Sequence, residues 1–127
     1  MRRRLLLAVA LASVVAAGTL AYLLASSPST PAPVSAAQAT AAAADSCRQL
    51  AAFDELVRAN APLDQVNAAL KRATDRARTA ARGDARWQAL AGGTQSLRIA
   101  LDANDARAAR VGIDVVRAEC RRSSARP

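Results

Sequence analysis

The stretch Arg82-Gly83-Asp84-Ala85-Arg86-Trp87 decides how many helices this chain forms. The residues before it, from Leu63 to Ala80, carry an apolar stripe at alternating spacings of three and four, which is typical of a helix with one buried face. The next step of that spacing would place Asp84 in the apolar row. Glycine suits the residue that follows a helix, and aspartate suits the residue that precedes one. The stretch therefore predicts that one helix ends here and another begins.

Two further helices are predicted, one at each end of this pair. Ser46-x-x-Gln49 is a capping-box pattern, so we expect the first helix to begin at Ser46 and to stop near Asn60, before Pro62. The last helix should start at Asn104-Asp105. Gly92-Gly93 lies inside the third helix, where it indicates either close contact with a neighbour or a kink.

The two cysteines, Cys47 and Cys120, lie at opposite ends of this helical region. In an antiparallel bundle of four helices those ends meet, and a disulfide can form. If the second and third helices were one continuous helix, the cysteines would lie too far apart for the bond. An intermolecular disulfide is the alternative, and gel mobility with and without reductant would separate the two. The sequence thus predicts an all-α fold, a small antiparallel four-helix bundle closed by one disulfide over residues 45–122, with a tail at 123–127.

The N-terminus has the pattern of a membrane-targeting segment. Three arginines precede 21 uncharged residues, Leu5 to Ala25, which is long enough to cross a bilayer. Arginines on that side predict a cytoplasmic N-terminus and an extracytoplasmic domain. A cleaved signal peptide, which would give a secreted protein, is the alternative. Residues 26–44 hold three prolines and many alanines, and we expect them to form a disordered linker.

Composition limits the chemistry of the chain. Its 127 residues include no histidine, which removes the commonest general base and the commonest metal ligand. The acidic residues are scattered, and no metal-binding or phosphate-cradling motif occurs. We therefore expect no catalytic residues, no cofactor and no metal. Aromatic residues make up only 2%, so the core should consist of alanine, leucine and valine.

Basic residues give the chain a net charge of +8, of which Arg2, Arg3 and Arg4 contribute three, leaving +5 elsewhere. A possible polyanion-binding face consists of Lys71, Arg72, Arg78, Arg82 and Arg86. A solvated helix surface is the simpler interpretation, because acidic residues interrupt this set and no aromatic residue interleaves it. No nucleic-acid partner is expected. Arg82-Gly83-Asp84 resembles an integrin-binding tripeptide, but helix capping explains it better.

The pattern of two cysteines bracketing alanine-rich helices, with Gly83-Asp84-Ala85-Arg86-Trp87 at a helix start, resembles small exported helical proteins of uncharacterised function found in actinobacteria. That resemblance implies no activity. Together with the N-terminal segment, it leads us to expect a non-enzymatic, membrane-tethered module of the cell envelope that binds or spaces an unknown envelope partner. The alternative is a secreted basic protein that binds anionic lipid or an envelope polyanion. The sequence does not predict an oligomeric state.

Overall fold

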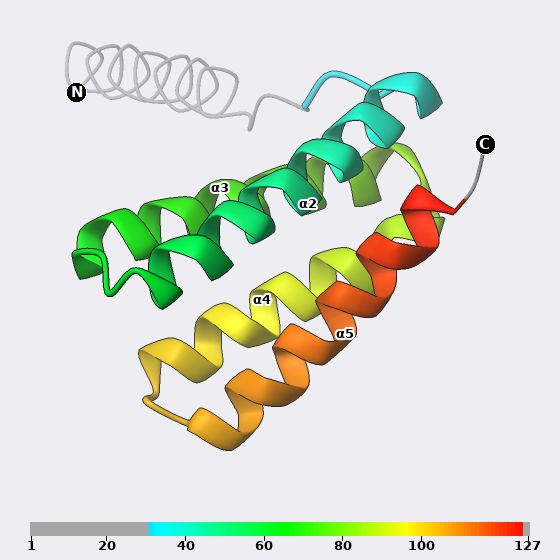
Figure 1. The fold of residues 1–127 in the computed structure, drawn as a ribbon. Helices are drawn as coiled ribbons and strands as arrows, with labels where there is room; N and C mark the ends of the chain where they lie inside the picture. The colour runs from blue at the N-terminus through cyan, green and yellow to red at the C-terminus, as the bar shows by residue number, and fades with distance from the viewer. Residues whose placement is uncertain (1–30, 126–127) are drawn as a thin grey trace, which may run out of the picture. The chain divides into compact units, whose positions relative to one another are not determined.

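A computed structural model describes residues 31–125, and all the regular secondary structure in this part of the chain is helical (Figure 1). Its four α-helices are α2 (Ala36–Arg58), α3 (Leu63–Gly83), α4 (Gln88–Asp102) and α5 (Ala106–Ser124), with a short 3-10 helix, η1 (Ala85–Trp87), between α3 and α4. The described helices are all too short or too polar to cross a membrane. The predicted membrane segment, Leu5 to Ala25, lies outside the described residues.

The N-cap of the first helix lies eleven residues earlier than we predicted. Ser35 is its N-cap: the Gln38 N–H donates to Ser35 Oγ (3.2 Å), and the Ser35 N–H donates to Gln38 Oε1 (2.9 Å). This is a complete capping box. The predicted start at Ser46 is wrong, because Ser46 is fully buried inside α2 and its hydroxyl donates to the Ala73 carbonyl oxygen of α3 (2.8 Å). The expected linker is therefore helical from Ala36 onward.

The predicted break between the second and third helices is confirmed. Helix α3 ends at Gly83, and the Asp84 carboxylate accepts a hydrogen bond from the Arg86 N–H (2.9 Å) at the start of η1. Gly83 does not have a positive φ, so its backbone does not require glycine. Glycine is required here by close packing, since a Cβ at this position would lie 2.8 Å from side-chain atoms of both Val34 and Ala39.

The four helices form two hairpins in which consecutive helices run in opposite directions (Figure 1). Asn60 and Asn104 lie in the two hairpin turns, and both adopt the left-handed backbone conformation that asparagine tolerates well. Helix α2 packs extensively on α3, and α4 on α5, whereas α2 and α5 touch each other much less. The fold therefore leaves one helix pair, α2 and α5, loosely packed.

Small residues dominate the core, as the composition predicted. Six alanines of α2 and α3 are fully buried, which lets the two helix axes approach closely: Ala39, Ala43, Ala69, Ala73, Ala77 and Ala80. The predicted apolar stripe is buried from Val66 onward, but its first member, Leu63, is 77% exposed at the start of α3. The largest fully buried side chains include Leu70, Leu90 and Leu97.

Glycines make the α4–α5 contact equally close. A Cβ on Gly93 would lie 3.0 Å from Val116 Cγ2, and one on Gly112 would lie 3.1 Å from the Leu97 backbone. Gly93 therefore confirms the close-contact interpretation of Gly92-Gly93. Gly92 itself has no neighbour within 4 Å of such a Cβ.

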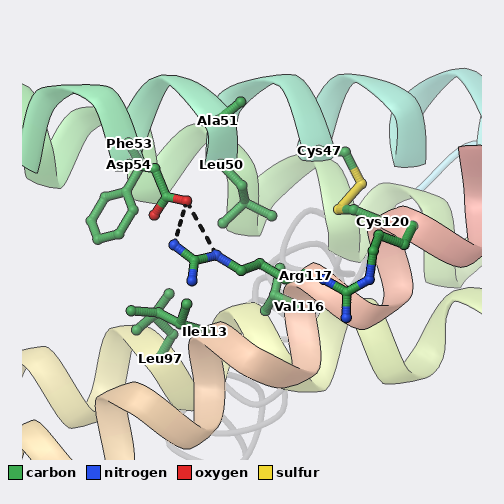
Figure 2. A pocket seen from close by; sticks show the side chains of 11 residues that line it. Cys47, Leu50, Ala51, Phe53, Asp54, Leu97, Ile113, Val116, Arg117 and Cys120 are labelled. Atoms are coloured by element: carbon green, nitrogen blue, oxygen red, sulfur yellow. Dashed lines mark hydrogen bonds and ion pairs between the residues drawn. A yellow bond between two sulfur atoms is a disulfide. The ribbon is translucent and has the colours of Figure 1, made fainter. Parts of the chain in front are cut away.

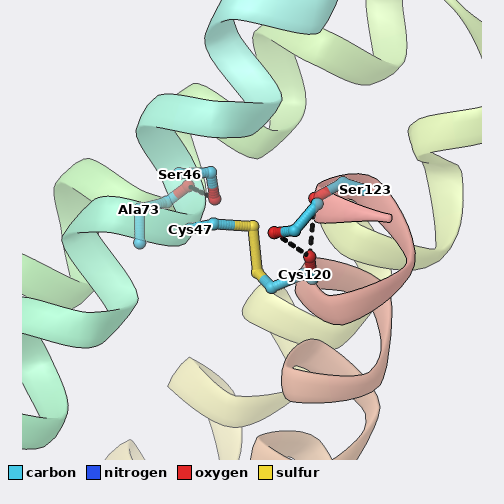
Figure 3. Close-up of a disulfide and its surroundings, with 6 residues drawn as sticks. Ser46, Cys47, Ala73, Cys120 and Ser123 are labelled. Carbon is cyan, nitrogen blue, oxygen red and sulfur yellow. Dashed lines mark hydrogen bonds between the residues drawn. A yellow bond between two sulfur atoms is a disulfide. The ribbon is translucent and has the colours of Figure 1, made fainter. Parts of the chain in front are cut away.

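One disulfide joins the two hairpins, between Cys47 of α2 and Cys120 of α5 (Figure 3). The two Cα atoms lie 5.7 Å apart, within the range such a bond needs. The predicted pairing is confirmed as intramolecular. On the α5 side, the hydroxyls of Ser123 and Ser124 both donate to the Cys120 carbonyl oxygen (2.7 and 3.0 Å). These bonds satisfy a carbonyl in the last turn of α5.

Candidate binding cleft between α2 and α5

The loosely packed pair α2 and α5 encloses a cleft of about 240 Å³ (Figure 2). Its lining is mainly apolar and comes from three helices: Leu50 and Phe53 of α2, Leu97 of α4, and Ile113 and Val116 of α5. Phe53, Leu97 and Val116 are buried parts of the core, whereas Leu50 and Ile113 are only partly buried. The cleft is therefore a hollow in the side of the hydrophobic core.

Helical spacing places these side chains together. On α2, Cys47, Leu50 and Asp54 follow each other at three and four residues, and so share one face. On α5 the same spacing relates Ile113, Val116, Arg117 and Cys120. Because the disulfide holds these two faces opposite each other, both helices present their cleft residues to the same space.

Two cross-links from α2 to α5 border the cleft. The disulfide is one of them, and an ion pair between Asp54 and Arg117 is the other (Figure 2). Arg117 donates from Nη2 and from Nε to Asp54 Oδ2, at 2.7 and 3.3 Å. The Asp54 side chain is 24% exposed and that of Arg117 is 52% exposed. The ion pair is therefore at the surface, where its geometry shapes the opening more than it stabilises the fold.

A second hollow of about 690 Å³ adjoins the cleft towards the start of α2 and the end of α5. The two hollows share four lining residues: Cys47, Ala51, Cys120 and Arg121. Arg48 and Trp87 also line the second hollow. The Trp87 ring is buried beneath the Arg86 guanidinium, 5.2 Å from its centroid, and the buried Nε1–H finds no hydrogen-bond partner among the described residues. The space between α2 and α5 thus extends along both sides of the disulfide.

The five basic residues predicted from the sequence do not share one face. Lys71, Arg78 and Arg82 recur at spacings of seven and four, which puts them on one side of α3. Arg72 donates to the side-chain oxygen of Gln49 on α2 (3.0 Å), so it lies on the side of α3 that faces α2. Arg86 lies beyond the break in η1, where it pairs with Asp84 (2.7 Å). The structure therefore brings three of the five residues together.

One carboxylate and two neutral oxygens contact this three-residue row. Lys71 pairs with Asp75 one turn further along α3 (2.8 Å), and the hydrogen bond from Lys71 holds the pKa of the Asp75 carboxyl below its ordinary value of 3.8. Arg78 instead donates to the side-chain oxygen of Gln95 on α4, and Arg82 donates to the Thr79 hydroxyl. These last two contacts leave both guanidinium charges without a carboxylate partner within the described range.

The sequence did not predict the cleft, because helical spacing does not show how closely two facing helices pack. Helical spacing favours Arg58, four residues along α2, as the partner of Asp54, whereas Asp54 pairs with Arg117 on α5. The spacing of Asp54 from Cys47 and of Arg117 from Cys120 could have indicated that both lie beside the disulfide. Within residues 31–125, no three metal-binding side chains gather into a possible metal site.

Comparisons of the chain with protein-family models, with curated proteins and with solved structures find no match.

Proposed function

We propose that this chain is a non-enzymatic binding module, tethered to a cell membrane by Leu5 to Ala25, whose cleft between α2 and α5 receives an apolar group of a ligand. The cleft carries this proposal: it opens the side of the core between α2 and α5, which touch each other far less than the two helices within each hairpin do. A domain that served only as a spacer would gain stability by closing that space with larger side chains.

The size and lining of the cleft support a small apolar group as the occupant. A cavity of about 150 Å³ lined by aliphatic and aromatic side chains is enough to bind benzene. This cleft has about 240 Å³ and an apolar floor. It is smaller than most sites for drug-sized ligands, which begin at about 300 Å³. We therefore propose that it accepts one group of one or two rings, or a branched aliphatic group of similar size.

The disulfide supports an extracytoplasmic location, because such bonds persist outside the reducing cytoplasm. The arginines before Leu5 favour the same orientation. Together with the resemblance to exported actinobacterial helical proteins, these features favour a module of the cell envelope. Membrane fractionation with N-terminal sequencing tests the tether. A membrane-bound chain that retains Leu5 to Ala25 supports it, and a soluble chain with a new N-terminus after this segment supports the secreted alternative.

Isoleucine methyl groups offer a direct test of the cleft. The chain has only two isoleucines, Ile113 in the cleft and Ile99, which is 57% exposed and outside it. We would label both δ1 methyl groups with carbon-13 in the full chain, held in zwitterionic nanodiscs, and titrate 2-naphthalenemethanol as a neutral two-ring probe. We expect the Ile113 resonance to shift and saturate while Ile99 stays in place.

A variant that fills the cleft provides the matched control for this titration. Ala51 lines the cleft and is exposed, so Ala51→Leu adds bulk there without disturbing buried packing. Ala106→Leu adds the same bulk at an exposed position of α5 outside the cleft. We expect Ala51→Leu to lower the affinity for the probe and Ala106→Leu to leave that affinity unchanged. If neither methyl group responds to the probe in the unaltered chain, the cleft does not bind apolar groups.

A second candidate function is binding of an anionic lipid or polyanion through the row of Lys71, Arg78 and Arg82. The two arginines favour it, because they contact neutral oxygens and keep their charge available. Binding to anionic vesicles that weakens with salt and is lost in Arg78→Gln/Arg82→Gln would support this candidate. Equal binding by the Arg107→Gln/Arg110→Gln control, which keeps the row, is expected in that case.

A further inference from the structure

Building on the proposed function of the cleft, we infer that its ligand is an apolar acid, whose ring or branched aliphatic group enters the cleft and whose anionic group binds the Arg121 guanidinium. The anionic group can be a carboxylate, phosphate or sulfonate, since all three offer oxygens that a guanidinium binds well.

Arg121 is placed to receive such a group. It lines both the cleft and the second hollow, at the point where they meet beside the disulfide. Its neighbours on α5 already have partners, because Arg117 pairs with Asp54 and Arg122 pairs with Glu119 (2.8 Å). Arg121 contacts no carboxylate within residues 31–125 and makes no side-chain hydrogen bond there.

The surrounding charges also favour an anion. Within the cleft, Asp54 balances Arg117, so Arg121 leaves one positive charge in excess. Arg48 lines the second hollow, and its one carboxylate partner, Asp45, is shared with Arg76 outside that lining, at 3.1 and 2.8 Å. The mouth of the site is therefore positive on both sides, which attracts an anion and disfavours a cation.

A structural role for Arg121 makes a different prediction. A cation in the last turn of a helix is favourable because it faces the negative end of the helix dipole, and this contribution does not depend on any ligand. If that were the whole role of Arg121, its replacement would change stability and leave the relative affinity for acid and neutral ligands unaltered. The comparison of two matched ligands therefore separates the two roles.

The experiment compares 2-naphthoate with 2-naphthalenemethanol, which carry the same two rings with and without the charge. Both are titrated into the full chain in zwitterionic nanodiscs, with Ile113 as the reporter and Ile99 as the internal control. We expect the acid to bind about tenfold more tightly than the alcohol, the worth of one charge-assisted contact at a partly exposed site. In Arg121→Gln the two affinities should become equal, while Arg110→Gln, which removes an arginine of α5 outside the cleft, should keep the tenfold preference.

The possible outcomes distinguish failure of the acid-binding inference from failure of the proposed function of the cleft. Equal affinities in the unaltered chain would overturn the inference and leave the binding module standing. A preference that survives Arg121→Gln but disappears in Arg48→Gln would overturn the assignment to Arg121. No shift of Ile113 with either ligand would overturn both the inference and the proposed function. A tenfold preference that only Arg121→Gln removes would support the acid-binding site.

Discussion

Asp54 and Arg117 are 63 residues apart in the chain, and they meet at 2.7 Å across the opening between α2 and α5. Apart from the disulfide, no other ion pair or covalent bond joins these two helices within residues 31–125. The pair links the first hairpin to the second on the border of the cleft. Because both side chains are partly exposed, we interpret the pair as one that fixes the spacing of α2 and α5 at the cleft opening and adds little to stability.

This interpretation predicts a small effect on stability. Asp54→Asn and Arg117→Gln should each lower the free energy of unfolding by less than about 1 kcal/mol, as expected for an exposed ion pair. Urea denaturation followed by circular dichroism measures this, and the double variant gives the coupling energy. The exposed Lys71–Asp75 pair within α3 serves as the control. A coupling energy well above that of the control would show that the Asp54–Arg117 pair stabilises the fold more than its exposure suggests.

The disulfide should matter far more to stability. Cys120 follows Cys47 by 73 residues, and closing a loop of that length is worth about 4 kcal/mol in the chain-entropy model. We expect Cys47→Ser/Cys120→Ser to lower the free energy of unfolding by an amount near that value. Urea denaturation of the oxidised chain against the double variant measures the loss. Equal stabilities would contradict the prediction, and a dimer band on a non-reducing gel would contradict the intramolecular pairing.

Local signals in the sequence predicted the helix break but not the first helix start. Gly83 and Asp84 mark the break because capping chemistry acts within one turn. The start was ambiguous, because Ser35-x-x-Gln38 and Ser46-x-x-Gln49 have the same capping pattern. The structure selects the first, because it lets the small alanines of 36–44 pack closely on α3. That gain depends on the distance between two helices, which an alanine-rich sequence does not reveal.

The candidate site was predictable only in part, for a related reason. The disulfide was predictable, because the number of helices determines whether the two ends of the helical region, which carry Cys47 and Cys120, lie close together. The partner of Asp54 was not, since the choice between Arg58 and Arg117 depends on how far apart α2 and α5 lie. The cleft itself is a property of loose packing between these two helices. Residue spacing shows which side chains share a face, but it does not show whether the facing helix fills the space.

The buried hydroxyl of Ser46 gives a test of the corrected first helix. Ser46→Ala removes its hydrogen bond to the Ala73 carbonyl oxygen, and we expect a loss of about 1 kcal/mol in the free energy of unfolding. Thr40→Ala is the control, because both hydrogen bonds of the Thr40 hydroxyl are exposed: it donates to the Ala36 carbonyl oxygen (3.0 Å) and accepts from Arg86 Nη2 (3.2 Å). Thermal or urea unfolding measures both. If Ser46 were an exposed helix cap, Ser46→Thr would be tolerated, whereas burial predicts that the extra methyl group also destabilises the fold.

Replacement by alanine should change the free energy of unfolding in opposite directions at two of the glycines. Gly92→Ala places a Cβ in open space, so the higher helix propensity of alanine should stabilise the fold by up to about 1 kcal/mol. Gly112→Ala places a Cβ at 3.1 Å from backbone atoms of Leu97, and overpacking of this kind costs about 1–3 kcal/mol. We expect a net loss at Gly112 despite the gain in propensity. Equal effects at the two positions, measured by urea unfolding, would contradict the close approach of α4 and α5.

Asp75 gives a prediction for pH. The hydrogen bond from Lys71 lowers the pKa of the Asp75 carboxyl in the folded state below 3.8, so the folded chain binds this proton less readily than the unfolded chain. The contribution to stability is therefore fully present above pH ~4, and it is lost as the pH falls through the folded pKa. Because the pair is exposed and screened by solvent, its size should be about 0.5 kcal/mol or less.

The matched variants for this test are Asp75→Asn and Lys71→Gln. At neutral pH, each should lower the free energy of unfolding by this small amount, and 1 M salt should reduce the loss because it screens exposed charges. Asp75→Asn should equal the unaltered chain in stability once the pH is below the folded pKa, because Asp75 is then neutral in both. Adding Lys71→Gln to Asp75→Asn should introduce no further dependence on pH in the acidic range. A loss that persisted unchanged into acid would show that Asp75 acts through packing and not through its charge.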